Sequence, residues 1–85
     1  MAIEASMNPL GKVIVDDDAL LIRGPLSKKS IPYERITSVE SNALTSTLKI
    51  ETGAQQHRIQ LWNMRRVSEI REAIEARMRE RQGAR

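Results

Sequence analysis

Four basic residues around a Gly-Pro turn are the side chains best placed to bind an anion: Arg23, Lys28, Lys29 and Arg35. Lysine and arginine form charge-assisted hydrogen bonds to phosphate and carboxylate oxygens, so these residues are a candidate anion patch. Lysines on an edge strand also prevent pairing between sheets of different molecules, which is a purely structural role. The sequence leaves both interpretations open and favours the structural one.

The other reactive side chains form no pattern that supports catalysis or metal binding. Asp16–Asp18 lack the alternating oxygen ligands and the distant glutamate of a calcium loop, so we interpret them as an exposed turn. His57 is the only histidine, and no nucleophile or paired carboxylate supports it. Cysteine is absent, which excludes thiolate metal sites. We therefore predict no enzyme, no metal and no cofactor, with His57 as a half-buried strand residue.

The chain has 85 residues and a net charge of +3, which suits one small domain without implying an anionic partner. Arginines crowd its C-terminal part, but interleaved glutamates cancel most of their field and no aromatic platform exists for stacking bases, so we do not expect nucleic-acid binding. No apolar run approaches the ~18 residues that cross a bilayer. With no secretion signal visible, we expect a cytoplasmic protein, or one peripheral at the inner membrane.

Short β-branched runs bounded by turn residues predict an antiparallel sheet. Pro32 cannot donate to a ladder, so we expect a bend there, followed by a 3₁₀ turn and another strand from Ile36. Strict alternation of apolar and polar residues predicts a hairpin around Gly53. The expected strands cover residues 13–15, 19–23, 28–31, 36–41, 46–51 and 57–62.

The periodicity changes after Asn63, a plausible helix N-cap. Val67, Ile70, Ile74 and Met78 fall at helical spacing, which predicts an amphipathic helix over 64–81. The fold class is therefore α+β, with one C-terminal helix against a sheet.

Residues 1–10 are weakly patterned. We interpret them as a flexible leader, in which Met7 is an alternative start. The domain then covers residues 11–82, and residues 83–85 form a tail.

Two segments of the sequence resemble motifs of the bacterial pleckstrin-homology-like (PH-like) domains. One is the apolar-proline step that opens Ile31–Ile36, with Val39 following, and the other is the strand end Ile50–Gly53. The resemblance covers roughly residues 12–80. It implies a strongly bent antiparallel sheet, a partial barrel, capped by the C-terminal helix. Such domains have seven strands, whereas the sequence indicates five or six, so either the sheet is trimmed or a neighbouring chain completes its edge.

The resemblance and the lack of site chemistry predict a non-catalytic binding module that acts through protein contacts. Self-association is expected among these contacts, because so small a domain has neither disulfides nor metal to stabilise it. Trp62 is the candidate interface residue, because tryptophan is enriched at the centres of protein interfaces. The sequence leaves two placements open: Trp62 packs under the helix start, or it lies on an exposed contact surface. The alternative function is peripheral binding of anionic lipid or phosphate through the candidate anion patch. Phosphoinositide-binding relatives hold basic residues in a comparable loop, but their Lys-x(n)-Arg-x-Arg arrangement is absent here.

Overall fold

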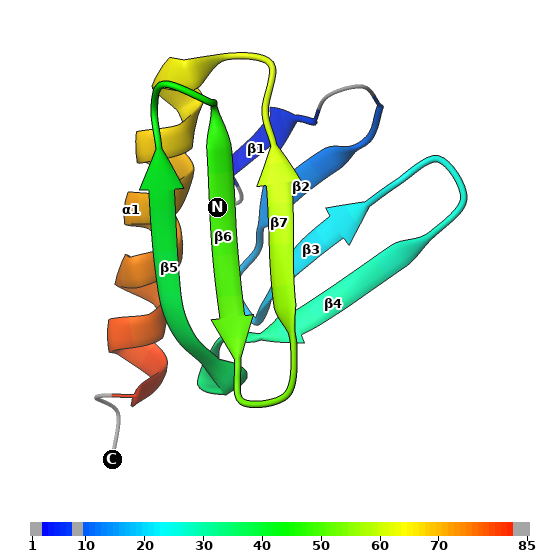
Figure 1. Ribbon diagram of the computed structural model, residues 1–85. Helices are drawn as coiled ribbons and strands as arrows, with labels where there is room; N and C mark the ends of the chain where they lie inside the picture. Colours follow the sequence, from blue (N-terminus) through cyan, green and yellow to red (C-terminus); the bar gives the residue numbers. More distant parts are fainter. Residues whose placement is uncertain (1–2, 8–9, 83–85) are drawn as a thin grey trace.

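The chain folds into two antiparallel sheets and one helix, as the computed structural model of residues 3–7 and 10–82 shows (Figure 1). The first sheet has the order β1-β2-β3-β4 and the second the order β5-β6-β7. A 3₁₀ turn, η1, leads from the first sheet to the second. The elements are β1 (Ile3–Ser6), β2 (Lys12–Val15), β3 (Ala19–Arg23), β4 (Lys28–Pro32), η1 (Tyr33–Arg35), β5 (Ile36–Asn42), β6 (Thr47–Thr52), β7 (Gln56–Gln60) and α1 (Met64–Gln82).

Alternation along the strands puts one apolar face of each sheet toward the other. Val13 pairs with Ile22 and Val15 with Leu20 across β2 and β3, and all four side chains are buried. In the second sheet, Leu48 pairs with Ile59 in the same way. Because side chains alternate between faces along a strand, the polar residues between these positions face outward. The core is thus the space between the two inner faces.

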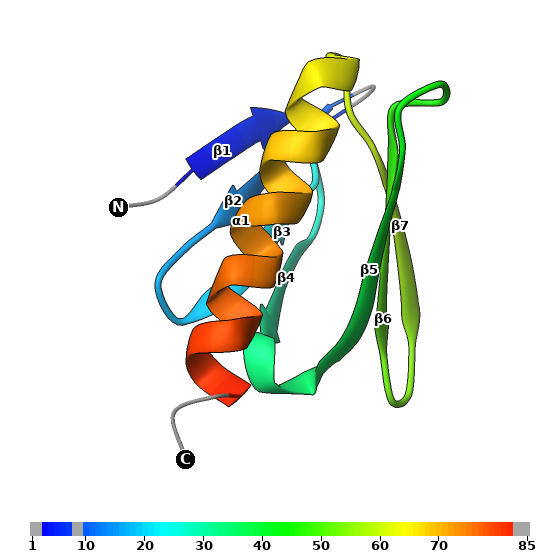
Figure 2. The same cartoon turned by 90° about the vertical axis from the view of Figure 1, so that its left-hand side faces the viewer.

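Helix α1 closes one side of that space. Its buried residues are Val67, Ile70 and Ile74, the stripe expected from the sequence, while Met78 packs partly buried against the core. Figure 2 shows the helix lying across the opening between β1 and β5, both of which it contacts. Asn63 caps it, since its side-chain oxygen accepts a hydrogen bond of 2.9 Å from the Arg65 backbone amide. The predicted fold class and the predicted helix are confirmed.

The flexible leader is the expectation that the structure corrects. Residues Ile3–Ser6 form β1, which pairs with β2, and Ala5 is 7% exposed in the core. Met7 then bridges to Leu61. The segment carries little apolar alternation because Ala5 is its only buried residue, so its pattern gave no strand signal. This strand completes the seven, without a neighbouring chain. Residues 8–9 of the expected leader and the expected tail at 83–85 lie outside the described residues.

Gly11 is required where the chain enters β2. Its φ angle is +110°, a conformation that side-chain-bearing residues rarely adopt. A Cβ atom at this position would lie 2.2 Å from the carbonyl oxygen of Arg23, which is part of the backbone of the neighbouring strand. The β1–β2 and β3–β4 connections therefore lie in close contact at this end of the molecule.

We expect Gly11→Ala to lower the free energy of unfolding by roughly 3 kcal/mol, because it adds backbone strain and a steric clash. Gly53→Ala is the matched control, since a Cβ atom there meets nothing within 4 Å. Its effect should stay within about 0.5 kcal/mol. Urea unfolding of both variants measures the difference, and equal effects would contradict this role for Gly11.

Candidate functional site

The four residues of the candidate anion patch do not lie on one surface. Arg23 and Lys28 are cross-strand partners at the end of the β3–β4 hairpin, on the outer face of the first sheet. Lys29 pairs with Ile22 and lies on the inner face of β4, on the same side as the buried Ile31. Arg35 belongs to η1, at the other end of β4. The alternation of β4 thus separates the two neighbouring lysines.

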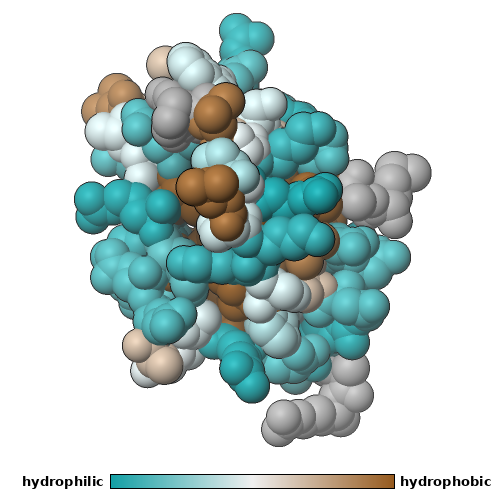
Figure 3. Space-filling view, turned by 90° about the vertical axis from the view of Figure 1, so that its right-hand side faces the viewer, coloured by the Kyte–Doolittle hydropathy of each residue, from teal (hydrophilic) through white to brown (hydrophobic). Residues whose placement is uncertain are grey.

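Lys29 and Arg35 meet at a groove between β4 and β7. One hollow of about 710 Å³ extends from Lys29 to Arg35 and reaches the β6–β7 turn and His57. A second, of about 280 Å³, shares Lys29 and His57 and continues toward the β3–β4 loop. We call the two together the edge groove. Figure 3, which faces this side of the molecule, shows apolar surface between hydrophilic side chains. The residues that line both hollows include no Asp or Glu.

Four chain connections follow one another along the upper and right-hand margin of the molecule in Figure 1, from the β5–β6 loop at the upper left to the β3–β4 hairpin at the right. They are the β1–β2, β3–β4 and β5–β6 loops and the connection from β7 to α1. Hydrogen bonds join them: the Trp62 amide donates to the Ser6 carbonyl at 3.4 Å, and the Leu61 amide donates to the Ser46 carbonyl at 2.8 Å. Gly11 packs on the Arg23 carbonyl, as described above. We call this surface the loop end.

Each connection of the loop end presents a large apolar side chain to solvent. Leu26 is 99% exposed and Leu44 is 93% exposed, which leaves them almost without contacts. Leu10, Trp62 and Met64 are more than half exposed. Each of the four connections thus carries at least one exposed apolar side chain. Sequence reasoning missed Leu10, Leu26 and Leu44, although Leu26 directly after Gly-Pro is an isolated apolar residue in a turn.

The stretches that form this end contain basic residues and no acidic ones of their own, although Glu4 and Glu69 lie beside them. Residues 10–12, 23–30, 42–47 and 61–66 contain no Asp or Glu; their charged residues are Lys12, Arg23, Lys28, Lys29, Arg65 and Arg66. Two of these have acidic neighbours, because Lys12 pairs with Glu4 at 3.4 Å and Arg66 with Glu69 at 2.6 Å. Within the described ranges, Arg23, Lys28 and Lys29 form no ion pair. The loop end is therefore apolar at its tips and positive around them.

Trp62, the candidate interface residue, is 62% exposed and belongs to this end. It lines a hollow with Glu4, Lys12 and Arg66 instead of packing under the start of the helix. Of the two placements considered from the sequence, the structure has the exposed one. His57 lies half-buried in β7, as expected, but it also borders the edge groove.

The comparisons with known proteins address the fold. No protein-family model matches the sequence, and no curated protein matches it either. The solution structure of the N-terminal PH domain of human ARAP2 is similar over 95% of this chain and 80% of that chain, with a TM-score of 0.71 and 11% identity. The chain has a PH-like fold. So low an identity shows the fold alone, and the expectation of a bacterial subgroup stays a prediction.

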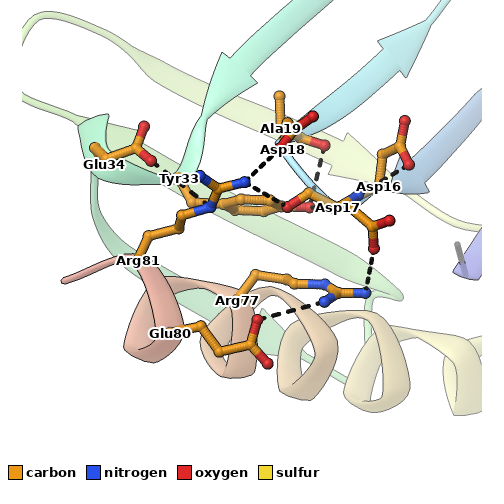
Figure 4. Close-up of polar contacts among 9 residues, drawn as sticks. All are labelled: Asp16, Asp17, Asp18, Ala19, Tyr33, Glu34, Arg77, Glu80 and Arg81. Carbon is orange, nitrogen blue, oxygen red and sulfur yellow. Dashed lines mark hydrogen bonds and ion pairs between the residues drawn. The ribbon is translucent and has the colours of Figure 1, made fainter. Parts of the chain in front are cut away.

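The opposite end of this PH-like domain holds Asp16–Asp18, in the exposed turn that the sequence predicted. Arg77 of α1 pairs with Asp17 at 3.0 Å, and Arg81 pairs with Asp18 (Figure 4). The aspartates thus tie the β2–β3 turn to the last turns of the helix. In the part of the chain that the structure describes, no three His, Cys, Asp or Glu side chains are arranged to hold a metal ion. No helix within those ranges has the length and apolar character to cross a bilayer.

Tyr33 lies beneath this turn with no exposed surface. Its hydroxyl oxygen is 2.5 Å from the Asp16 carbonyl oxygen and 3.1 Å from that of Ala19. Burial favours the neutral phenol and raises the pKa of Tyr33 from 10.0 to about 12, although the nearby Arg77 acts in the opposite direction. The phenol is therefore a structural hydrogen-bond donor rather than an acid–base catalyst.

We expect Tyr33→Phe to lower the free energy of unfolding by about 1–2 kcal/mol, because the part-buried hydrogen bonds of its hydroxyl to the Asp16 and Ala19 carbonyls are lost. The raised pKa adds a pH dependence. An unfolded tyrosine ionises near pH 10, whereas the folded one keeps its proton to about 12. The contribution of Tyr33 is thus fully present below pH 10 and decreases as the pH rises toward 12.

Because Tyr33 is the only tyrosine, absorbance at the phenolate band follows its ionisation directly. The native protein should titrate near 12 and the urea-unfolded protein near 10. The stability difference between wild type and Tyr33→Phe should shrink above pH 10. A native midpoint near 10 would contradict the buried, hydrogen-bonded phenol.

Proposed function

We propose that this PH-like domain is a non-catalytic binding module that docks on anionic membrane surfaces through its loop end. One observation carries the proposal: exposed apolar side chains occur on all four connections of that end, beside basic residues of which Arg23, Lys28 and Lys29 form no ion pair within the described ranges. Leucine, methionine and tryptophan side chains suit the apolar and interfacial layers of a bilayer. Lysine and arginine around them suit its anionic head groups.

The magnitudes are those of reversible binding. Full burial of one leucine side chain contributes about 1.5–3 kcal/mol, and insertion at a bilayer surface gives part of this. Each Lys or Arg near an anionic surface adds about 1 kcal/mol. Neither contribution alone holds a protein on a membrane, and stable association combines the two. The loop end offers both kinds of group on neighbouring loops.

The distribution of acidic residues supports the same orientation. Asp16–Asp18 and Glu34 lie at the opposite end, where Arg77 and Arg81 pair with them. A negative surface therefore attracts the loop end and repels the exposed aspartates, so the domain approaches with its apolar tips forward.

This conclusion reverses the order of the two functions expected from the sequence, where protein contact came first. The sequence indicated Trp62 as the candidate interface residue, and an exposed tryptophan suits a protein partner as well as a membrane. Self-association remains a prediction: two copies could bury their loop ends together, but the positive charges would face one another. Sedimentation velocity at micromolar concentration tests it. A monomer would refute self-association, and a dimer that Leu26→Ser plus Leu44→Ser dissociates would refute the membrane proposal.

Co-sedimentation with vesicles tests the membrane proposal. We expect binding to phosphatidylcholine vesicles that contain phosphatidylserine and little binding to phosphatidylcholine alone. Arg23→Gln plus Lys28→Gln should weaken binding by about 2 kcal/mol, roughly 30-fold, since two charges leave the surface. Leu26→Ser plus Leu44→Ser should weaken it at unchanged charge.

The matched control is Arg35→Gln plus Arg58→Gln, which removes the same charge from exposed residues outside the loop end. Its affinity for the vesicles should change only slightly. If this control lost as much vesicle affinity as Arg23→Gln plus Lys28→Gln, net charge alone would explain the binding. That result would contradict docking through the loop end.

A further inference from the structure

Two sheet edges border the edge groove. Within the described residues, β4 pairs only with β3 and β7 pairs only with β6. Each strand therefore has a side with free backbone groups, although on β7 this free edge ends before Leu61, which bridges to Met7. Such an edge presents a row of N–H and C=O groups that a further extended segment can pair with.

The turn geometry identifies which groups of β7 face outward. The Thr52 amide donates to the Gln55 carbonyl at 2.8 Å, which makes these two residues a hydrogen-bonded pair. Because such pairs alternate in an antiparallel ladder, Ile50 and His57 form the next one. The backbone N–H and C=O groups of Gln56 and Arg58 then point away from β6. On β4, by contrast, Pro32 has no N–H to offer.

The side chains around this edge favour an anionic occupant with an apolar face. Ile31 lies in the wall of the first hollow, and Ile22, Ile59 and Met7 lie in that of the second. Lys29, Arg35 and Arg58 supply the charge, and no carboxylate lines either hollow to oppose it. A strand has side chains on alternate faces, so one that alternates apolar and acidic residues matches both features.

We infer that the edge groove binds an extended acidic segment of a partner protein, which pairs with β7 as an added strand. Residues Gln56–Gln60 span five positions, so the pairing segment has about five or six residues. Its apolar side chains face the isoleucines of the groove on the inner side, and its carboxylates, on the opposite side, lie beside Arg58 on the outer face of β7, with Arg35 near the end of the groove. A free phosphate would use the charges but neither the strand edge nor the apolar wall.

This site adjoins the loop end and shares Lys29 with it, but its strand edge on β7 lies outside the four connections, so the inference does not rest on membrane docking. The segment that binds here comes from a protein, and its position on β7 leaves Leu26 and Leu44 exposed. The earlier expectation of binding through protein contacts thereby acquires a location and a partner chemistry.

A fluorescently labelled peptide of alternating valine and glutamate provides the probe. We expect saturable binding by fluorescence anisotropy, with NMR amide shifts concentrated in β4 and β7. A peptide of valine and lysine should not bind. Arg35→Gln plus Arg58→Gln should weaken binding at least tenfold, whereas Arg23→Gln plus Lys28→Gln, the pair at the loop end, should change it less than twofold.

Two N-methylated versions of the peptide test strand addition itself. In one version the methyl groups replace the N–H groups at odd positions, and in the other at even positions. Only one of these sets faces β7, so one version should lose at least tenfold in affinity while the other binds like the parent. Equal behaviour of the two versions, or shifts confined to the loop end, would overturn the proposal. A dimer that the peptide does not dissociate would also overturn the proposal, because a second copy of the chain would then occupy the edge of β7.

Discussion

The burial of the α1 stripe between the two sheets is the interaction on which the molecule depends. Two small sheets that face each other leave open sides, and a single helix covers only one of them. Val67, Ile70 and Ile74 are fully buried on that side, next to β1 and β5. On the other side, between β4 and β7, no strand or helix of the described residues covers the opening. The position of the helix therefore decides where the domain has free backbone, and thus where a partner can add to it.

The two ends of the domain differ in how their charges are used. At the aspartate turn, basic side chains of α1 meet acidic ones, and a buried phenol joins the turn to the layer below. Surface ion pairs contribute little stability each, so this end is held mainly by Tyr33. At the loop end, basic residues surround exposed leucines that stabilise nothing within the chain. The contacts at the aspartate turn stabilise the fold, whereas the exposed leucines and basic residues of the loop end would be stabilised only by a bound partner.

Much of the fold was predictable from local patterns. The helix bounds, the 3₁₀ turn after Pro32 and the hairpin around Gly53 follow from periodicity and turn residues, and each agrees with the structure. Strand β1 did not follow, because a strand with one buried alanine has no periodic signal and is held by its pairing with β2. The four basic residues were predicted to form one patch, but the geometry of the sheet places Lys28 and Lys29 on opposite faces of β4. The exposed leucines became informative only when four distant connections were seen to share one end.

The aromatic residues have a practical consequence. The chain contains one tyrosine, one tryptophan and no phenylalanine, and they lie in opposite environments. Tyr33 is sealed in the interior beneath the aspartate turn, whereas Trp62 stands in solvent among the loops. Indole emission therefore reports on what approaches the outside of the molecule, and phenol absorption reports on the integrity of its inside. The domain carries two separate optical reporters, so occupancy and unfolding can be followed in one sample without any label.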